Sequence, residues 1–136
     1  MVNEVILVDT SVMIGFIKGD SNTSVDAFIQ IPQKQNSIAV SILTYEEVLR
    51  GAKSEFEFLR LDRLVSAFNI IFLPTEKSFY KEVSNIYLKL RKRGITIPSV
   101  PDIMIALTAV KANHKLLHND KHFDEIKTVL PELETL

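Results

Sequence analysis

VILVDTS, residues 5–11, is the stretch of the chain that decides the fold. Its four apolar residues, rich in branched side chains, run without interruption into Asp9, Thr10 and Ser11. A short continuous apolar run that ends in polar residues is typical of a strand buried on both faces, as in a parallel sheet. Ser11 can cap a short helix over residues 12–18, which Gly19 would end. The stretch therefore predicts a parallel strand, then a helix, with an acid at their junction.

The rest of the chain repeats this alternation of strand and helix. Further strands are expected at 37–42, 69–73 and 115–118, the one at 69–73 being buried like the first. Alternating strands and helices imply parallel strands joined by right-handed crossovers. We therefore expect the α/β class, as a three-layer α/β/α sandwich with a central, mainly parallel sheet, in a single domain over residues 1–136. The expected helices begin after Asn22 or Thr23, at Thr44, at Ser54, at Thr75 and at Asp102, and a last helical turn and an edge strand close the chain.

Composition limits the kinds of function. The chain has no cysteine, which excludes disulfides and thiolate metal sites and fits a reducing cytoplasm. Its longest apolar runs fall far short of a membrane span, so no membrane association is expected. The formal net charge is −1, so the chain as a whole does not attract nucleic acid. Any such contact must come from a local basic patch.

Four carboxylates are expected to meet at one edge of the sheet. Asp9 ends the first strand, Glu47 lies on the helix after the second, Asp102 opens the helix before the last strand, and Asp120 follows that strand. In open α/β sheets, functional groups gather at the carboxyl ends of the strands. Glu46 competes with Glu47, but Glu47 lies three residues after Thr44 and shares its side of the helix, so we favour Glu47.

Each acid also has a purely local explanation. Thr44-x-x-Glu47 and Ser99-x-x-Asp102 have the spacing of a capping box, Asp9 can cap the helix that follows it, and Asp120 lies in a turn sequence. The complete set favours another interpretation, because two like charges about 4 Å apart repel by roughly 4 kcal/mol at an effective dielectric near 20. A cation between them removes that cost. An all-carboxylate ligand set favours Mg²⁺ or Mn²⁺, which serve in phosphodiester chemistry.

These segments resemble the motifs of the PIN-domain nucleases, and within them of the VapC toxins. Residues 5–11 resemble the first motif, an apolar strand followed by Asp-Thr-Ser, and TYEEVLRG at 44–51 resembles Thr-x-x-Glu-Leu-x-x-Gly. PDIMIA at 101–106 is similar to the third motif, and LLHNDKHF at 116–123 to Leu-x-Thr-x-Asp-x-x-Phe. Val48 replaces the usual Leu, and His118 replaces a Thr or Ser whose hydroxyl orients groups of the pocket.

The resemblance implies an Mg²⁺- or Mn²⁺-dependent endoribonuclease that cleaves RNA as the toxin of a type II toxin–antitoxin pair. It further implies a homodimer and a small VapB-like antitoxin that covers the acidic groove. The catalytic and metal-binding residues would be Asp9, Glu47, Asp102 and Asp120, with Thr10, Ser11, Thr44 and His118 in supporting positions.

Other functions are weighed against this one. A haloacid dehalogenase-type phosphatase needs Asp-x-Asp, and Ser11 stands at its second position. A receiver domain needs a pair of acids near the first strand, and Glu4 is at the wrong end of that strand. Two alternatives on the same fold stay open. One is a catalytically altered or inactive scaffold that acts through a protein partner, an alternative that the unusual residue His118 leaves open. The other is an RNA-processing nuclease that is not a toxin.

Three further groups of residues complete the analysis. The basic run Lys89, Arg91, Lys92 and Arg93 either offsets a helix dipole or contacts RNA phosphates, and Arg50 and Lys53 are further phosphate candidates. The histidines at 114, 118 and 122 would form a metal site only on one continuous helix, which we do not expect. The aromatic and leucine residues between 56 and 87 are interpreted as core or dimer interface.

Overall fold

The computed structural model describes residues 4–32, 37–96 and 99–136. Its centre is a parallel sheet of β1 (Ile6–Val8), β2 (Ile38–Ser41), β3 (Asn69–Ile71) and β4 (Lys115–Leu117), in the order β3-β2-β1-β4. In the register, Leu7 lies opposite Ala39 on one side and Leu116 on the other. The predicted strands are therefore present, each shorter at its ends, and the first strand of the chain occupies a central position.

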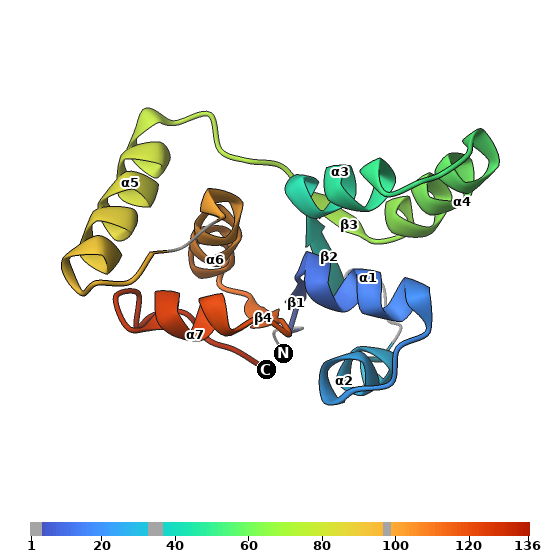
Figure 1. Ribbon diagram of the computed structural model, residues 1–136, viewed down its shortest axis with the longest axis horizontal. Helices are drawn as coiled ribbons and strands as arrows, with labels where there is room; N and C mark the ends of the chain where they lie inside the picture. The colour runs from blue at the N-terminus through green and yellow to red at the C-terminus, as the bar shows by residue number, and fades with distance from the viewer. Residues whose placement is uncertain (1–3, 33–36, 97–98) are drawn as a thin grey trace.

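Helices cover both faces of this sheet, as a three-layer α/β/α sandwich requires. Ile6 and Val8 point into the core beneath one group of helices, whereas Leu7 points into the core beneath the other. Figure 1 shows the two groups on opposite sides of the strands. The first group is α1 (Thr10–Lys18), α2 (Thr23–Gln30), α3 (Ile42–Arg50) and α4 (Glu55–Ser66), and the second is α5 (Lys77–Lys92), α6 (Val100–Ala112) and α7 (Lys121–Lys127).

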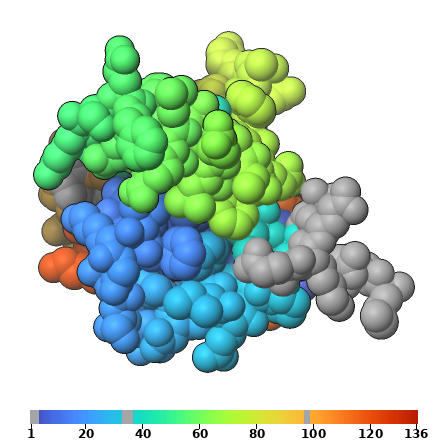
Figure 2. All heavy atoms as spheres, turned by 90° about the vertical axis from the view of Figure 1, so that its right-hand side faces the viewer, coloured from blue at the N-terminus to red at the C-terminus, as the bar shows by residue number. Residues whose placement is uncertain are grey.

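Figure 2 shows the outer surface of the first group, with α1 and α2 in blue below the green α4.

The predicted cap of α2 is confirmed, because Asn22 accepts a hydrogen bond from the backbone N–H of Val25. The expected edge strand is reduced to residues 134–136, where Leu116 donates to Glu134 and Leu136 donates to Leu116.

The prediction of a buried strand at 69–73 was wrong. The strand ends at Ile71, it pairs only with β2, Asn69 is exposed, and Phe72 beyond it is 69% exposed. An edge strand has one neighbour instead of two, so its apolar residues are less completely covered. An apolar run does not reveal the position of a strand within the sheet, which depends on how the whole chain is arranged.

Several predicted helix starts were also wrong. Asp9, not Ser11, is the N-cap of α1, and Ser41, not Thr44, is the N-cap of α3. The long helix begins at Lys77 after Glu76, without a side-chain cap, rather than after Thr75. Both α1 and α3 begin directly at the end of a strand. The side chain at the junction therefore accepts a hydrogen bond from a free backbone N–H of the first turn. The Ser or Thr two or three residues later already lies within the helix.

The helix that was expected to begin at Asp102 begins two residues earlier. Helix α6 already begins at Val100, with Pro101 in its first turn, where a missing N–H costs no hydrogen bond. Asn113 ends this helix in the left-handed conformation. None of the helices that the structure describes is long and apolar enough to cross a membrane.

Candidate functional site

A pocket of about 430 Å³ opens at the carboxyl ends of the strands and brings the four predicted acids together. Asp9 reaches it from the end of β1, Glu47 from α3, Asp102 from the first turn of α6, and Asp120 from the N-cap of α7. Four segments far apart in sequence thus contribute one carboxylate each. The other lining residues are Thr10, Ser11, Ile14, Ser99 and His122.

Asp9 is the most deeply placed of these acids, with 3% of its surface exposed. One carboxylate oxygen, Oδ2, accepts hydrogen bonds from the backbone N–H of Ser11 at 3.0 Å and from its hydroxyl at 2.6 Å. The other oxygen, Oδ1, is buried and has no hydrogen-bond partner among the described residues. Burial raises the pKa of Asp9, and the Ser11 hydrogen bonds oppose that rise. The local capping role and an unused ligand oxygen therefore coexist in one side chain.

Ser11 connects the end of β1 to the end of β4. Its hydroxyl donates to Asp9 and accepts a hydrogen bond from the backbone N–H of Asn119 at 3.1 Å. The backbone N–H of Asp9 also donates to the carbonyl of Leu117 at 2.9 Å. These bonds hold the turn that carries Asp120 against the residue that carries the buried carboxylate.

Glu47 faces the pocket and Glu46 faces solvent, as predicted. Glu46 is exposed and pairs with Arg50, whose Nε lies 2.8 Å from a Glu46 carboxylate oxygen. Glu47 is half-buried, and its pKa is raised by burial and then by the charge of Asp9. The capping-box explanation for Glu47 was wrong, because Thr44 lies inside the helix. Its fully buried hydroxyl accepts a hydrogen bond at 2.9 Å from Thr10, which joins α3 to α1 beside the pocket.

Asp102 is half-buried in the first turn of α6. Burial and then the negative charges of Asp9 and Asp120 together raise its pKa to about 7. The capping-box explanation fails here as well, because Ser99 is the N-cap of α6 but makes no side-chain cap hydrogen bond. The raised pKa values show that these carboxylates are close enough to oppose each other's ionisation.

Asp120 caps α7 and is oriented from both sides. One of its carboxylate oxygens accepts from the backbone N–H of His122 at 2.9 Å, and its own N–H donates to Nδ1 of His118 at 3.2 Å. His118 is not among the lining residues; its ring packs against Phe123, with 4.9 Å between centroids. His122 does line the pocket, and sequence analysis missed it. The available signal was its place in the first turn of the helix that Asp120 caps.

The donor set fits a hard divalent cation. Four carboxylates line the pocket, and one of them, Asp9, has a buried oxygen without a hydrogen-bond partner. Burial and then neighbouring negative charges raise the pKa values of Glu47 and Asp102, and a bound cation would relieve that repulsion. Among the described residues, no three His, Asp or Glu side chains already form a closed cage. Mg²⁺ does not require one, because it usually keeps several waters and takes one or two protein carboxylates directly.

The basic residues predicted to bind RNA do not line the acidic pocket. Arg50 is engaged with Glu46, Lys53 is exposed, and Arg91 lies over the Tyr87 ring at 5.9 Å. Lys92 and Arg93 border a separate hollow. The three histidines come from the end of α6, the end of β4 and α7, so they share no helix.

The aromatic and leucine residues, expected in the core or a dimer interface, lie in the core only in part. Phe56, Phe58 and Leu59 of α4 are exposed, Phe56 to 79%. Phe68, Tyr80 and Tyr87 do pack against the two cores. The exposed residues lie in the first half of α4, whereas Leu61 and Val65 carry the contact between that helix and the body of the protein.

Known proteins are similar to this chain in sequence and in fold. The PIN domain family model matches residues 6–129. Ribonuclease VapC1 of Methanocaldococcus jannaschii is 32% identical over 123 residues, which cover 90% of this chain and 81% of that protein. VapC ribonuclease Mb1587 of Mycobacterium bovis is 26% identical over 91% of this chain and 92% of its own.

A solved structure agrees at the level of the fold. VapBC2 from Rickettsia felis, bound to a DNA fragment from its promoter, superposes with a TM-score of 0.72 at 23% identity, over 97% of both chains. The family match covers nearly all of the sequence, including the four acidic segments. This chain belongs to the PIN-domain family.

Proposed function

We propose that this chain is a divalent-metal-dependent endoribonuclease and the toxin of a type II toxin–antitoxin pair. One observation carries the proposal: four carboxylates from separate segments line one pocket, and the most buried of them has an unpartnered oxygen. The names of its relatives, ribonuclease VapC1 and VapC ribonuclease Mb1587, support hydrolysis of RNA.

Asp9, Glu47, Asp102 and Asp120 are the residues that would hold Mg²⁺ or Mn²⁺. Such an ion, when bound, activates water and neutralises charge on the phosphate. Ser11 holds the Asp9 carboxylate through Oδ2, which leaves Oδ1 without a hydrogen-bond partner.

The proposal includes partners. The VapBC complexes from Rickettsia felis and nontypeable Haemophilus influenzae share this fold, which supports a small VapB-like antitoxin as the inhibitor of this chain. We also propose a homodimer. The exposed Phe56, Phe58 and Leu59 provide apolar surface for a protein contact. We place the active protein in the cytoplasm, where RNA is available and where reducing conditions break no disulfide in a chain without cysteine.

The decisive experiment compares the wild-type chain with Asp9→Asn in induced bacterial cells, with growth and total RNA integrity measured together. Asp26→Asn is the matched control, because Asp26 is exposed on α2, away from the pocket. We expect growth arrest and RNA cleavage in the wild type and the control, and neither in Asp9→Asn. Equal behaviour of wild type and Asp9→Asn, both folded, would instead favour a scaffold that acts through a partner.

A further inference from the structure

We infer that a basic hollow at the ends of α5 and α7 binds phosphates of the RNA substrate beside the acidic pocket. The inference rests on the proposed nuclease function and adds to it the place where the substrate is held. The hollow has a volume of about 500 Å³ and is lined by Lys89, Lys92, Arg93, Thr128, Val129 and Pro131.

The cations of this hollow are free to meet an anion. Three other basic side chains are held in ion pairs, Arg50 with Glu46, Lys111 with Glu82 and Lys115 with Glu4. In the part of the chain that the structure describes, no carboxylate lies within ion-pair distance of the three basic residues of the hollow. Lys89 and Lys92 extend from exposed positions on α5, and Arg93 donates to the carbonyl of Thr128 at 3.2 Å.

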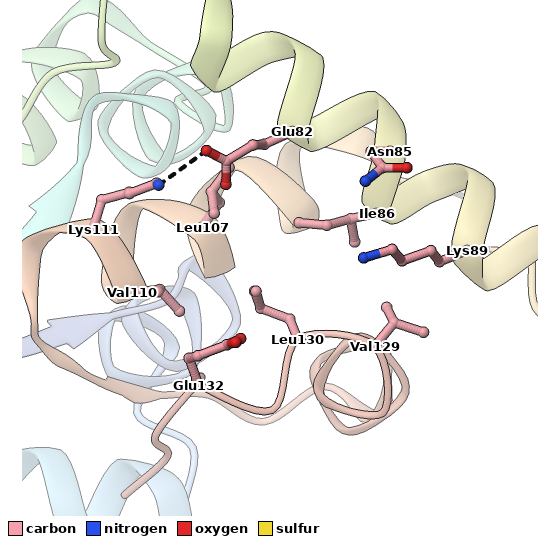
Figure 3. Close-up of a pocket in the computed structure, with 10 residues that line it drawn as sticks. All are labelled: Glu82, Asn85, Ile86, Lys89, Leu107, Val110, Lys111, Val129, Leu130 and Glu132. Atoms are coloured by element: carbon pink, nitrogen blue, oxygen red, sulfur yellow. Dashed lines mark hydrogen bonds and ion pairs between the residues drawn. The ribbon is translucent and has the colours of Figure 1, made fainter.

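Lys89 also borders a second cleft of about 340 Å³ between α5, α6 and the segment after α7. Figure 3 shows Lys89 reaching from α5 across this cleft towards Val129 and Leu130. Lys89 and Val129 line both spaces, so the cleft adjoins the hollow.

The packing of α5 on α6 places the hollow near the acidic pocket. Glu82, in the first half of α5, pairs with Lys111 in the last turn of α6 at 3.0 Å (Figure 3). Only residues 93–99 separate the end of α5 from the start of α6, and the two helices pack against each other, so they run antiparallel. The last turn of α5 consequently lies beside the first turn of α6, which carries Asp102.

Helix α7 gives a second measure of the separation. It begins at the N-cap Asp120 in the acidic pocket and ends at Thr128 in the hollow. Eight residues at a rise of 1.5 Å each correspond to about 12 Å. At roughly 3.4 Å per stacked nucleotide, this is about three to four nucleotides. One RNA strand can therefore reach both places.

Electrostatics explains why the substrate needs such a site. Phosphate contacts provide most of the affinity of proteins for nucleic acid. The acidic pocket is lined by four carboxylates and by no lysine or arginine, and the whole chain has a net charge of −1. A competing explanation is that the three cations only offset the dipoles of the two helix ends. The two explanations differ in what they predict for RNA binding.

The test measures binding of a fluorescein-labelled single-stranded oligouridylate to the intact protein by anisotropy, in EDTA to prevent cleavage, over a series of salt concentrations. The triple variant Lys89→Gln, Lys92→Gln, Arg93→Gln is compared with Lys18→Gln, Lys77→Gln, Lys81→Gln. The control variant loses the same number of charges from exposed positions outside the hollow. If the triple variant melts at a lower temperature than the wild type, the single variant Lys92→Gln is used in its place.

We expect weaker binding by the triple variant and a slope of log affinity against log salt that is shallower by about 2, since each phosphate on a single strand contributes about 0.7. Lys92→Gln alone should lower the slope by about 0.7. Unchanged binding in both variants, with cleavage by the wild type intact, would overturn this inference and leave the proposed function standing. Absence of any RNA binding or cleavage by the wild type would overturn both.

Discussion

The backbone N–H of Asp120 donates a hydrogen bond to Nδ1 of His118 across 3.2 Å. Because the N–H is the donor, Nδ1 carries no proton, and the neutral ring keeps its hydrogen on Nε2. His118 stands where the related motif has a hydroxyl, and its ring is held by Phe123. The imidazole thus supplies the acceptor that orients Asp120, without entering the pocket itself.

Replacing His118 by Asn should preserve this function, because the amide oxygen of Asn takes the place of Nδ1. Replacement by Gln carries its amide to the place of Nε2 and leaves the Asp120 N–H without its acceptor. We expect cleavage to fall about 2- to 10-fold further in His118→Gln than in His118→Asn, the value of one hydrogen bond. The measurement is kcat on RNA together with the Mn²⁺ concentration that gives half activity. Equal losses in the two variants would mean that the ring acts only through packing on Phe123.

The Thr10–Thr44 hydrogen bond should contribute to stability as a pair. Thr44→Val leaves the Thr10 hydroxyl, itself buried, without its acceptor, which should cost about 1–3 kcal/mol of the free energy of unfolding. The double variant Thr10→Val, Thr44→Val removes both partners, so we expect it to regain most of that loss. Urea unfolding of the two single variants and the double variant measures the coupling. Additive losses would show that the two hydroxyls act independently.

Stability should depend on pH through Asp102. Its pKa in the folded protein is about 7, against 3.8 for the free side chain, so the native state holds a proton that the unfolded chain has released between these values. In EDTA, the stability contribution of this group therefore falls as pH rises from about 4 to about 7 and is constant above that. The neutral variant Asp102→Asn avoids the loss.

The measurement for Asp102 is the melting temperature of wild type and Asp102→Asn at pH 5 and pH 8 in EDTA. We expect the melting temperature of Asp102→Asn to rise relative to that of the wild type from pH 5 to pH 8. Asp26→Asn, at an exposed position, should follow the wild type at both. A constant difference between Asp102→Asn and wild type across this range would show that the carboxyl titrates normally.

Divalent cations should stabilise the folded protein. A cation that binds only the native state adds about 2.7 kcal/mol when its concentration is 100 times its dissociation constant. We expect Mn²⁺ or Mg²⁺ to raise the melting temperature of the wild type, more at pH 8 than at pH 5, because protonated carboxyls bind no cation. Asp9→Asn should lose most of this response. A wild-type melting temperature that ignores millimolar Mn²⁺ would contradict the metal site.

Local patterns in the sequence were sufficient for the class of fold and for the acids of the site. The apolar run before Asp9 indicated a buried strand, and residues 6–8 do form a buried strand in the middle of the sheet. The chain order of strands and helices then implies that strand ends share one edge, where the predicted acids do lie together. Both inferences use information contained in neighbouring residues.

Only the tertiary structure decided which atoms meet. It placed the strand at 69–71 on the edge, buried Thr44 against Thr10, left the Asp9 Oδ1 oxygen without a partner, and put His122 in the pocket with His118 behind it. The physical reason is that side-chain periodicity reports only whether a face is covered. Which segment covers it, and whether a given oxygen finds a donor, depends on the distances between segments far apart in the chain.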